Sequence, residues 1–228
     1  MSASLREHLT GVSREAAVDW FLRTWHGIPE LPPVPVTAQI PSLLGQLLTL
    51  SRSYPTICSR QNRLISPIDV GDGLLCFYVE NQNVYRWAYR PGETDPVVFG
   101  QASQAGAWFT EQERLSGFLL QVCLFEALFS APYTASAAWL PSGAVTELLD
   151  RGQLQPVLTP WRWPGDPTVF HASDGAIGVT SQRRRANGAF GFDVTLAARD
   201  LEPLAYLPEI IQEHGDHWEH AQLADFVW

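Results

Sequence analysis

The chain has 228 residues, of which 46% are hydrophobic and 17% charged, and its formal net charge is -9. This composition excludes a collagen-like, coiled-coil or largely disordered chain. The acidic balance also argues against general binding to nucleic acid or to a membrane surface, because contacts with phosphate groups need clustered cations.

Features that would direct the chain into or across a membrane are absent from the sequence pattern. No stretch of about 20 predominantly apolar residues is present, and the charged N-terminal segment lacks the apolar core of a signal peptide. The three cysteines, Cys58, Cys76 and Cys123, are too few and too scattered for a disulfide framework. We therefore expect a cytoplasmic protein.

The N-terminal part of the sequence predicts two helices. Ser13 is a good N-cap for a helix over residues 14–25, in which apolar side chains recur at helical spacing. Four prolines between residues 29 and 35 end this pattern, because proline is not tolerated inside a helix. A leucine-rich segment then predicts a second helix over residues 41–51.

A β-hairpin is predicted next. Residues 74–79 and 84–89 are rich in aromatic and branched side chains, and a polar turn over residues 80–83 separates them. Alternation along the second strand places Arg86 with Ala88 on one face and Trp87 on the other. Residues 95–99 are expected to add a third strand.

The remaining elements complete an α+β pattern. The clearest helix covers residues 111–129, and further helices are expected over residues 142–151 and 200–214. Strands are predicted over residues 168–172, 176–181 and 189–198, with turns at 173–175 and 183–188. Because the strands form hairpins and no strand–helix–strand alternation occurs, we expect a twisted antiparallel sheet packed with helices.

Few motifs in the sequence indicate chemistry. His214, His217 and His220 lie near Glu213 and Asp216, which suggests a metal site, but the order does not match H-E-x-x-H and a solvated tail is the favoured interpretation. No nucleophile elbow, reactive cysteine or phosphate-binding loop is present. We therefore expect no cofactor and no bound metal.

Two charged segments point to partners instead. The basic triplet at residues 183–185 could contact nucleic acid or an acidic partner, although a solvated turn is the favoured interpretation. From Asp193 to the end, eight acidic residues stand against Arg199 alone. That segment fits a basic partner or serves solubility, and the sequence weighs these alternatives evenly.

Residues 71–88 and 95–99 resemble the SUKH superfamily, most closely its Smi/Knr-type bacterial branch. The shared features are a glycine-aspartate entry, the E-N-Q turn at residues 80–82, Trp87 in the second strand and the D-P-V-V segment that begins at Asp95. The helix around residues 116–120 and the segment over residues 126–133 extend the likeness.

The resemblance implies an α+β fold and a non-enzymatic binding role, often that of an immunity protein in a polymorphic toxin system. It implies a SUKH-like core over residues 1–140, with residues 141–228 as a strand–helix extension packed on the same sheet as one domain. The family supplies no catalytic residues to transfer to this chain.

The expected function is therefore that of a protein-binding module and not an enzyme. We expect an immunity protein that occludes a toxin domain, with a basic toxin domain as partner. The candidate partner-binding residues are Glu80, Asn81 and Gln82 in the hairpin turn, with Asp216, Trp218 and Glu219 near the C-terminus. The alternatives are a metal-dependent hydrolase that uses the C-terminal histidines and a regulatory scaffold.

Overall fold

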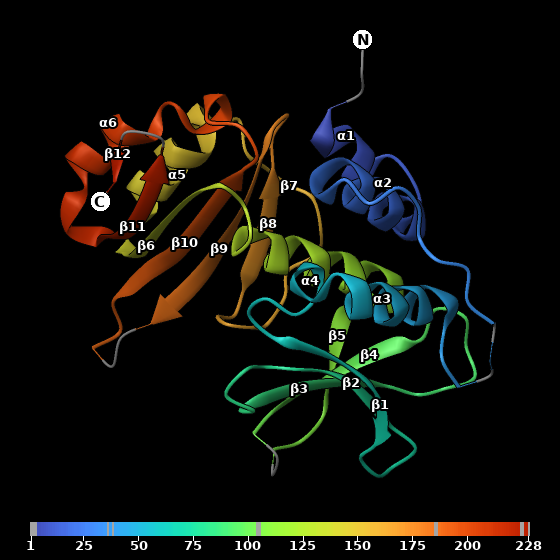
Figure 1. Cartoon of the computed structure of the whole chain (residues 1–228). Coiled ribbons are helices and arrows are strands. Elements are labelled where there is room, and N and C mark those ends of the chain that lie inside the picture. Colours follow the sequence, from blue (N-terminus) through green and yellow to red (C-terminus); the bar gives the residue numbers. More distant parts are fainter. Residues whose placement is uncertain are drawn as a thin grey trace. The chain divides into compact units, whose positions relative to one another are not determined.

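The structure, a computed structural model, describes residues 4–35, 37, 39–103, 106–184, 187–223 and 226–227. The chain forms two compact units, each built around one antiparallel sheet (Figure 1). The five-stranded unit comprises residues 12–126, and the seven-stranded unit comprises residues 1–11 together with 127–228. The predicted α+β class is confirmed.

The boundary between the two units lies between residues 126 and 127. It therefore precedes residue 140, at which the SUKH-like core was predicted to end. Strand β6 (Tyr133–Leu140) pairs with β10 (Phe190–Ala198) and β11 (Trp218–Leu223), so it belongs to the seven-stranded sheet. Residues 141–228 thus extend a second sheet and not the one that carries the predicted hairpin.

In its described residues, the five-stranded unit has three α-helices, one short 3-10 helix and a sheet whose strands follow one another in chain order. Its elements are α2 (Arg14–His26), α3 (Ser42–Ser53), η1 (Pro55–Ile57), β1 (Arg63–Asp69), β2 (Leu75–Val79), β3 (Tyr85–Tyr89), β4 (Val97–Ala102), β5 (Phe109–Arg114) and α4 (Leu115–Leu128). The last turn of α4 leads into the other unit. Because consecutive strands pair as hairpins, short turns suffice to connect them.

Local chemistry explains the two predicted N-terminal helices. The Ser13 hydroxyl accepts a hydrogen bond from the backbone N–H of Ala16 at 3.3 Å, and Gly27 ends α2 with a φ of 70°. Helix α3 starts at Ser42, so Pro41 is its N-cap residue and not part of its first turn. Both predicted helices are confirmed.

Helices α3 and α4 lie on one side of the five-stranded sheet (Figure 1). An aromatic core joins α4 to the sheet, since the ring of Phe118 lies 5.7 Å from those of Phe77 and Trp87. Tyr85 contacts Trp87 with ring centroids 4.7 Å apart. The predicted alternation of β3 is therefore confirmed: its aromatic side chains face α4.

A buried carboxylate occupies the end of this core. Glu126 accepts hydrogen bonds from the Tyr78 hydroxyl at 2.5 Å and from the backbone N–H groups of Gln61 and Asn62 at 2.5 and 3.0 Å. The Asn62 amide also donates to the Tyr78 oxygen at 3.1 Å. Burial raises the pKa of Glu126, while these donors oppose that shift.

The seven-stranded unit has the strand order β12-β11-β6-β10-β9-β8-β7. Its other elements are α1 (Leu5–Thr10), α5 (Ser142–Arg151), β7 (Gln155–Pro156), β8 (Thr168–Ala172), β9 (Ala176–Arg184), η2 (Glu202–Leu204), α6 (Leu207–Glu213), η3 (Gly215–His217) and β12 (Phe226–Val227). Leu148 of α5 and Ile211 of α6 share a buried apolar cluster with Leu196 and Trp218 of the sheet. This cluster fixes the two helices against the sheet.

Three sequence predictions need correction. The helix expected from residue 111 begins at Leu115, because residues 109–114 pair with β4 as strand β5. The helix expected over 200–214 is reduced to η2 and the shorter α6. Arg183 and Arg184 are residues of strand β9 and not of a turn; Arg185 lies outside the described residues.

Two findings bear on the cellular setting. All three cysteines are buried and free of disulfides. Among the helices in the described part of the chain, none combines the length and the apolar character that crossing a bilayer requires.

Candidate binding surface

The face of the five-stranded sheet opposite α4 is the candidate site, and we call it the outer sheet face. Cross-strand pairing aligns Cys76, Ala88 and Phe99 on it, and next to them Arg86 and Gln101. Side chains that are directly opposite on neighbouring strands share a face. In this unit, no helix among the described residues lies on this side of the sheet (Figure 1).

A small apolar cluster forms the centre of the outer sheet face. Cys76 and Ala88 are buried, together with Leu74, and the partly exposed rings of Phe99 and Trp108 pack against them. Burial raises the pKa of the Cys76 thiol, and the nearby Arg86 guanidinium opposes that shift. The thiol packs within this cluster, and its raised pKa disfavours the reactive thiolate form.

Two arginines stack on the aromatic rings of this face. The guanidinium carbon of Arg86 lies 5.2 Å from the ring centroid of Trp108, and that of Arg90 lies 5.9 Å from the ring centroid of Phe99. Neither arginine forms an ion pair with the described residues. Both cations are thus positioned against aromatic rings, and no carboxylate of the described residues forms an ion pair with either of them.

Hydrogen bonds hold the segment that carries Trp108 in place. The Arg86 Nε–H donates to the side-chain oxygen of Gln101 at 2.6 Å, and the Gln101 amide donates to the carbonyl of Gly106 at 2.6 Å. This chain of contacts ties β3, β4 and the residues before Trp108 together. The aromatic ring is therefore placed by the same arginine on which it stacks.

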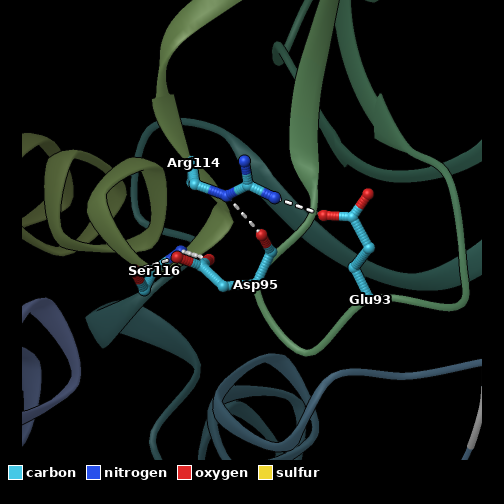
Figure 2. Close-up of polar contacts among 4 residues, drawn as sticks. All are labelled: Glu93, Asp95, Arg114 and Ser116. Atoms are coloured by element: carbon cyan, nitrogen blue, oxygen red, sulfur yellow. Dashed lines mark hydrogen bonds and ion pairs between the residues drawn. The ribbon is translucent and has the colours of Figure 1, made fainter.

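A second set of contacts fixes the loop after Arg90 (Figure 2). One Asp95 carboxylate oxygen accepts from the backbone N–H of Ser116 at 2.7 Å, and the other accepts from its hydroxyl at 3.0 Å. Arg114 donates to the Asp95 carbonyl at 2.6 Å and forms an ion pair with Glu93. Asp95 thereby anchors the β3–β4 loop to the first turn of α4.

Arg90, Phe99 and Trp108 line a hollow of about 510 Å³, together with Asp72, Leu74, Phe109 and Thr110. Its lining combines one planar cation, a group that can bind a carboxylate in a bidentate manner, with aromatic rings that supply apolar contact area. No cysteine thiolate or nucleophile–base pair lies among its lining residues.

The structure gives the predicted hairpin-turn residues different roles. The Glu80 carboxylate is buried and accepts from the backbone N–H groups of Gln82 and Val84 at 2.8 and 3.2 Å. Glu80 therefore stabilises the turn, whereas the side chains of Asn81 and Gln82 are exposed at its tip.

The predicted C-terminal residues lie in the seven-stranded unit. Asp216 and Glu219 are exposed, but Trp218 is 5% exposed and belongs to the core cluster. An indole ring in that position packs under the helices and does not serve as a surface anchor.

The three C-terminal histidines do not converge. His217 contacts the Ala138 carbonyl at 3.3 Å, and His220 contacts the Thr134 hydroxyl at 3.2 Å. His214 instead lies beside Glu213 and Glu147. The tertiary structure thus places His220 apart from the other residues that the sequence grouped as a metal-binding cluster, while His214 and His217 line one hollow with Glu213 and Asp216.

The fold and this surface define an α+β protein with an accessible, arginine- and aromatic-lined sheet face. No protein-family model, curated protein or solved structure matches the chain. The function must therefore be argued from the geometry of the surface itself.

Sequence reasoning missed most of the outer sheet face. The alternation along residues 84–89 predicted that Arg86 and Ala88 share one face of the strand, so this part of the surface could be found from the sequence. Trp108 stands in an irregular segment, and no periodic pattern indicates which strand it covers. Arg90 follows the end of β3, where alternation no longer fixes a side chain.

Proposed function

We propose that the chain is a protein-binding module without catalytic activity and that the outer sheet face is its binding surface. The observation that carries the proposal is the pair of arginines, Arg86 and Arg90, stacked on Trp108 and Phe99 without a carboxylate partner among the described residues. Arginine and tryptophan are enriched among the residues that dominate binding energy at protein interfaces.

The SUKH resemblance leads us to propose a more specific role, that of an immunity protein that acts in the cytoplasm and occludes a toxin domain. The free cysteines fit a reducing compartment. A net charge of -9 would accelerate the approach of a basic toxin domain. A regulatory scaffold would use the same surface, so the identity of the partner separates the two roles.

In this proposal, the net negative charge of the chain and the two arginines of the outer sheet face act at different stages of binding. The overall negative charge steers a basic partner, and the exposed Asp216 and Glu219 contribute to that field. Arg86 and Arg90 then pair with carboxylates on the contacted surface of the partner. A toxin domain whose functional cleft contains carboxylates would be blocked directly by such contacts.

The test compares single substitutions of exposed arginines on two sides of one unit. Arg90→Glu reverses a charge on the outer sheet face, and Arg52→Glu makes the same change on α3, where it serves as the control. Tagged wild-type and variant proteins are incubated with native lysate, and the captured proteins are compared by mass spectrometry. The partner is then purified, and its affinity for each protein is measured by calorimetry.

We expect Arg90→Glu to weaken binding of the partner by about 30-fold, which corresponds to about 2 kcal/mol for an anchor residue. The Arg52→Glu control should bind as the wild type does. If the purified partner binds Arg90→Glu and the wild type equally well, the outer sheet face is not the binding surface. If that partner carries no toxin domain, the immunity role is refuted while the binding role stands.

A further inference from the structure

We propose that Glu147, Glu213 and His214 form a binding site for a divalent transition-metal ion, with Zn²⁺ as the best fit. One ligand atom from each of these side chains lies within 4.8 Å of the other two. This site is on the seven-stranded unit and does not depend on the proposed binding function. It also differs from the set of three histidines that the sequence suggested.

Two packed helices supply the ligands. Glu147 projects from α5, Glu213 is the last residue of α6, and His214 is the C-cap residue of α6. The backbone N–H of His214 donates to the Ile210 carbonyl at 2.9 Å, which fixes the chain at this point. Since α5 and α6 share one buried cluster, their separation is set by packing and not by surface side chains.

The donor set selects the type of ion. One imidazole nitrogen and two carboxylates suit zinc, which accepts nitrogen and oxygen ligands in a tetrahedral arrangement. Magnesium and calcium prefer sets made of oxygen alone. Two ligands on one tetrahedral zinc ion lie roughly 3.5 Å apart, so side-chain rotations of all three residues that shorten their separations by about 1 Å would bring them into range.

The surroundings leave room for the rest of the coordination shell. Glu213 and His214, but not Glu147, border a hollow of about 340 Å³ that is also lined by Gln212, Asp216 and His217. The side chains of Glu213 and His214 make no hydrogen bond or ion pair with the described residues. Water would complete a four-coordinate ion at this position.

Arg151 contacts the proposed ligand Glu147 but does not occupy both of its carboxylate oxygens. Its guanidinium contacts one oxygen of Glu147 at 3.4 Å and pairs with Glu209 of α6. A carboxylate has a second oxygen that accepts independently. The same arginine therefore helps to hold α5 against α6 while Glu147 retains an oxygen for the ion.

Zinc titration of the full-length protein tests the site. The protein is prepared without a polyhistidine tag and treated with chelator, and zinc binding is measured by calorimetry and by thermal unfolding. The variants are His214→Ala and Glu147→Gln. The matched control is His220→Ala, which removes an exposed histidine of the same unit outside the proposed site.

We expect one zinc ion per chain with a Kd of about 10 µM or tighter, and a rise of about 3 °C in the unfolding temperature at tenfold excess over Kd. His214→Ala and Glu147→Gln should each weaken binding by at least about tenfold, and His220→Ala should not. Absence of one-to-one binding, unchanged binding by His214→Ala, or equal weakening by His220→Ala would overturn the assignment.

Discussion

The buried histidine of the seven-stranded sheet makes the stability of the protein dependent on pH. His171 on β8 is 5% exposed, and its Nε2 atom contacts the Thr180 hydroxyl at 3.0 Å. Its Nδ1 atom is buried and has no hydrogen-bond partner among the described residues. Burial disfavours the charged imidazolium and lowers the pKa of His171 from 6.5 to about 4.

The sign of the effect follows from proton binding in the two states. Between about pH 6.5 and pH 4, the unfolded chain binds a proton at this histidine and the folded chain does not. The free energy of unfolding therefore decreases as the pH falls through this interval. The difference between the pKa of 6.5 in the unfolded chain and the pKa of about 4 in the folded protein corresponds to a total loss of about 3 kcal/mol, of which about 2 kcal/mol is lost by pH 5.

The prediction is measured with His171→Leu, which cannot titrate. Urea unfolding of wild type and variant is followed between pH 7.5 and pH 5. The Thr180 hydroxyl loses its partner in the variant, which adds an offset that is the same at every pH. The stability of the wild type relative to the variant should fall by about 2 kcal/mol across this range. A difference that stays constant or grows as the pH falls would refute the reasoning.

The five-stranded unit yields three further predictions, each measured by urea unfolding. Tyr78→Phe should cost about 1–3 kcal/mol, because it removes a donor from the buried Glu126 carboxylate; a loss below about 0.5 kcal/mol would contradict this role. Glu80→Ala should cost about 1–2 kcal/mol, because two backbone N–H groups of the hairpin turn lose their acceptor; unchanged stability would count against it. Asp95→Ala should cost about 1–2 kcal/mol through loss of the contacts to Ser116 at the start of α4. Its control, Glu93→Ala, removes an exposed ion pair and should change stability by less than about 0.5 kcal/mol, so equal losses in the two variants would exclude the anchoring role.

Sequence reasoning succeeded where the pattern is local. Ser13 and Gly27 bracket α2 because capping depends on side-chain and backbone chemistry within one turn. The alternation in β3 predicted which side chains share a face, because successive side chains of a strand point to opposite sides.

Prediction from the sequence failed where contacts with a segment distant in the chain determine the conformation. Glu111 belongs to a segment that was predicted as the beginning of a helix, yet its carboxylate is buried and accepts from the Trp87 indole N–H at 2.9 Å. That acceptor position exists because β5 pairs with β4. Glu147 was not predicted beside His214, since their positions differ by 67, 214 minus 147, in the chain.

The sequence by itself determined the α+β class, the capped helices and the alternating faces of the hairpin, all of which follow from interactions within a few residues. Only the tertiary structure decided that the strands form two sheets, that Trp108 covers the outer sheet face and that His220 lies apart from the hollow that His214 and His217 line. These features depend on which distant segments exclude water from one another, and that choice is made by the packing of the whole unit rather than by any local pattern.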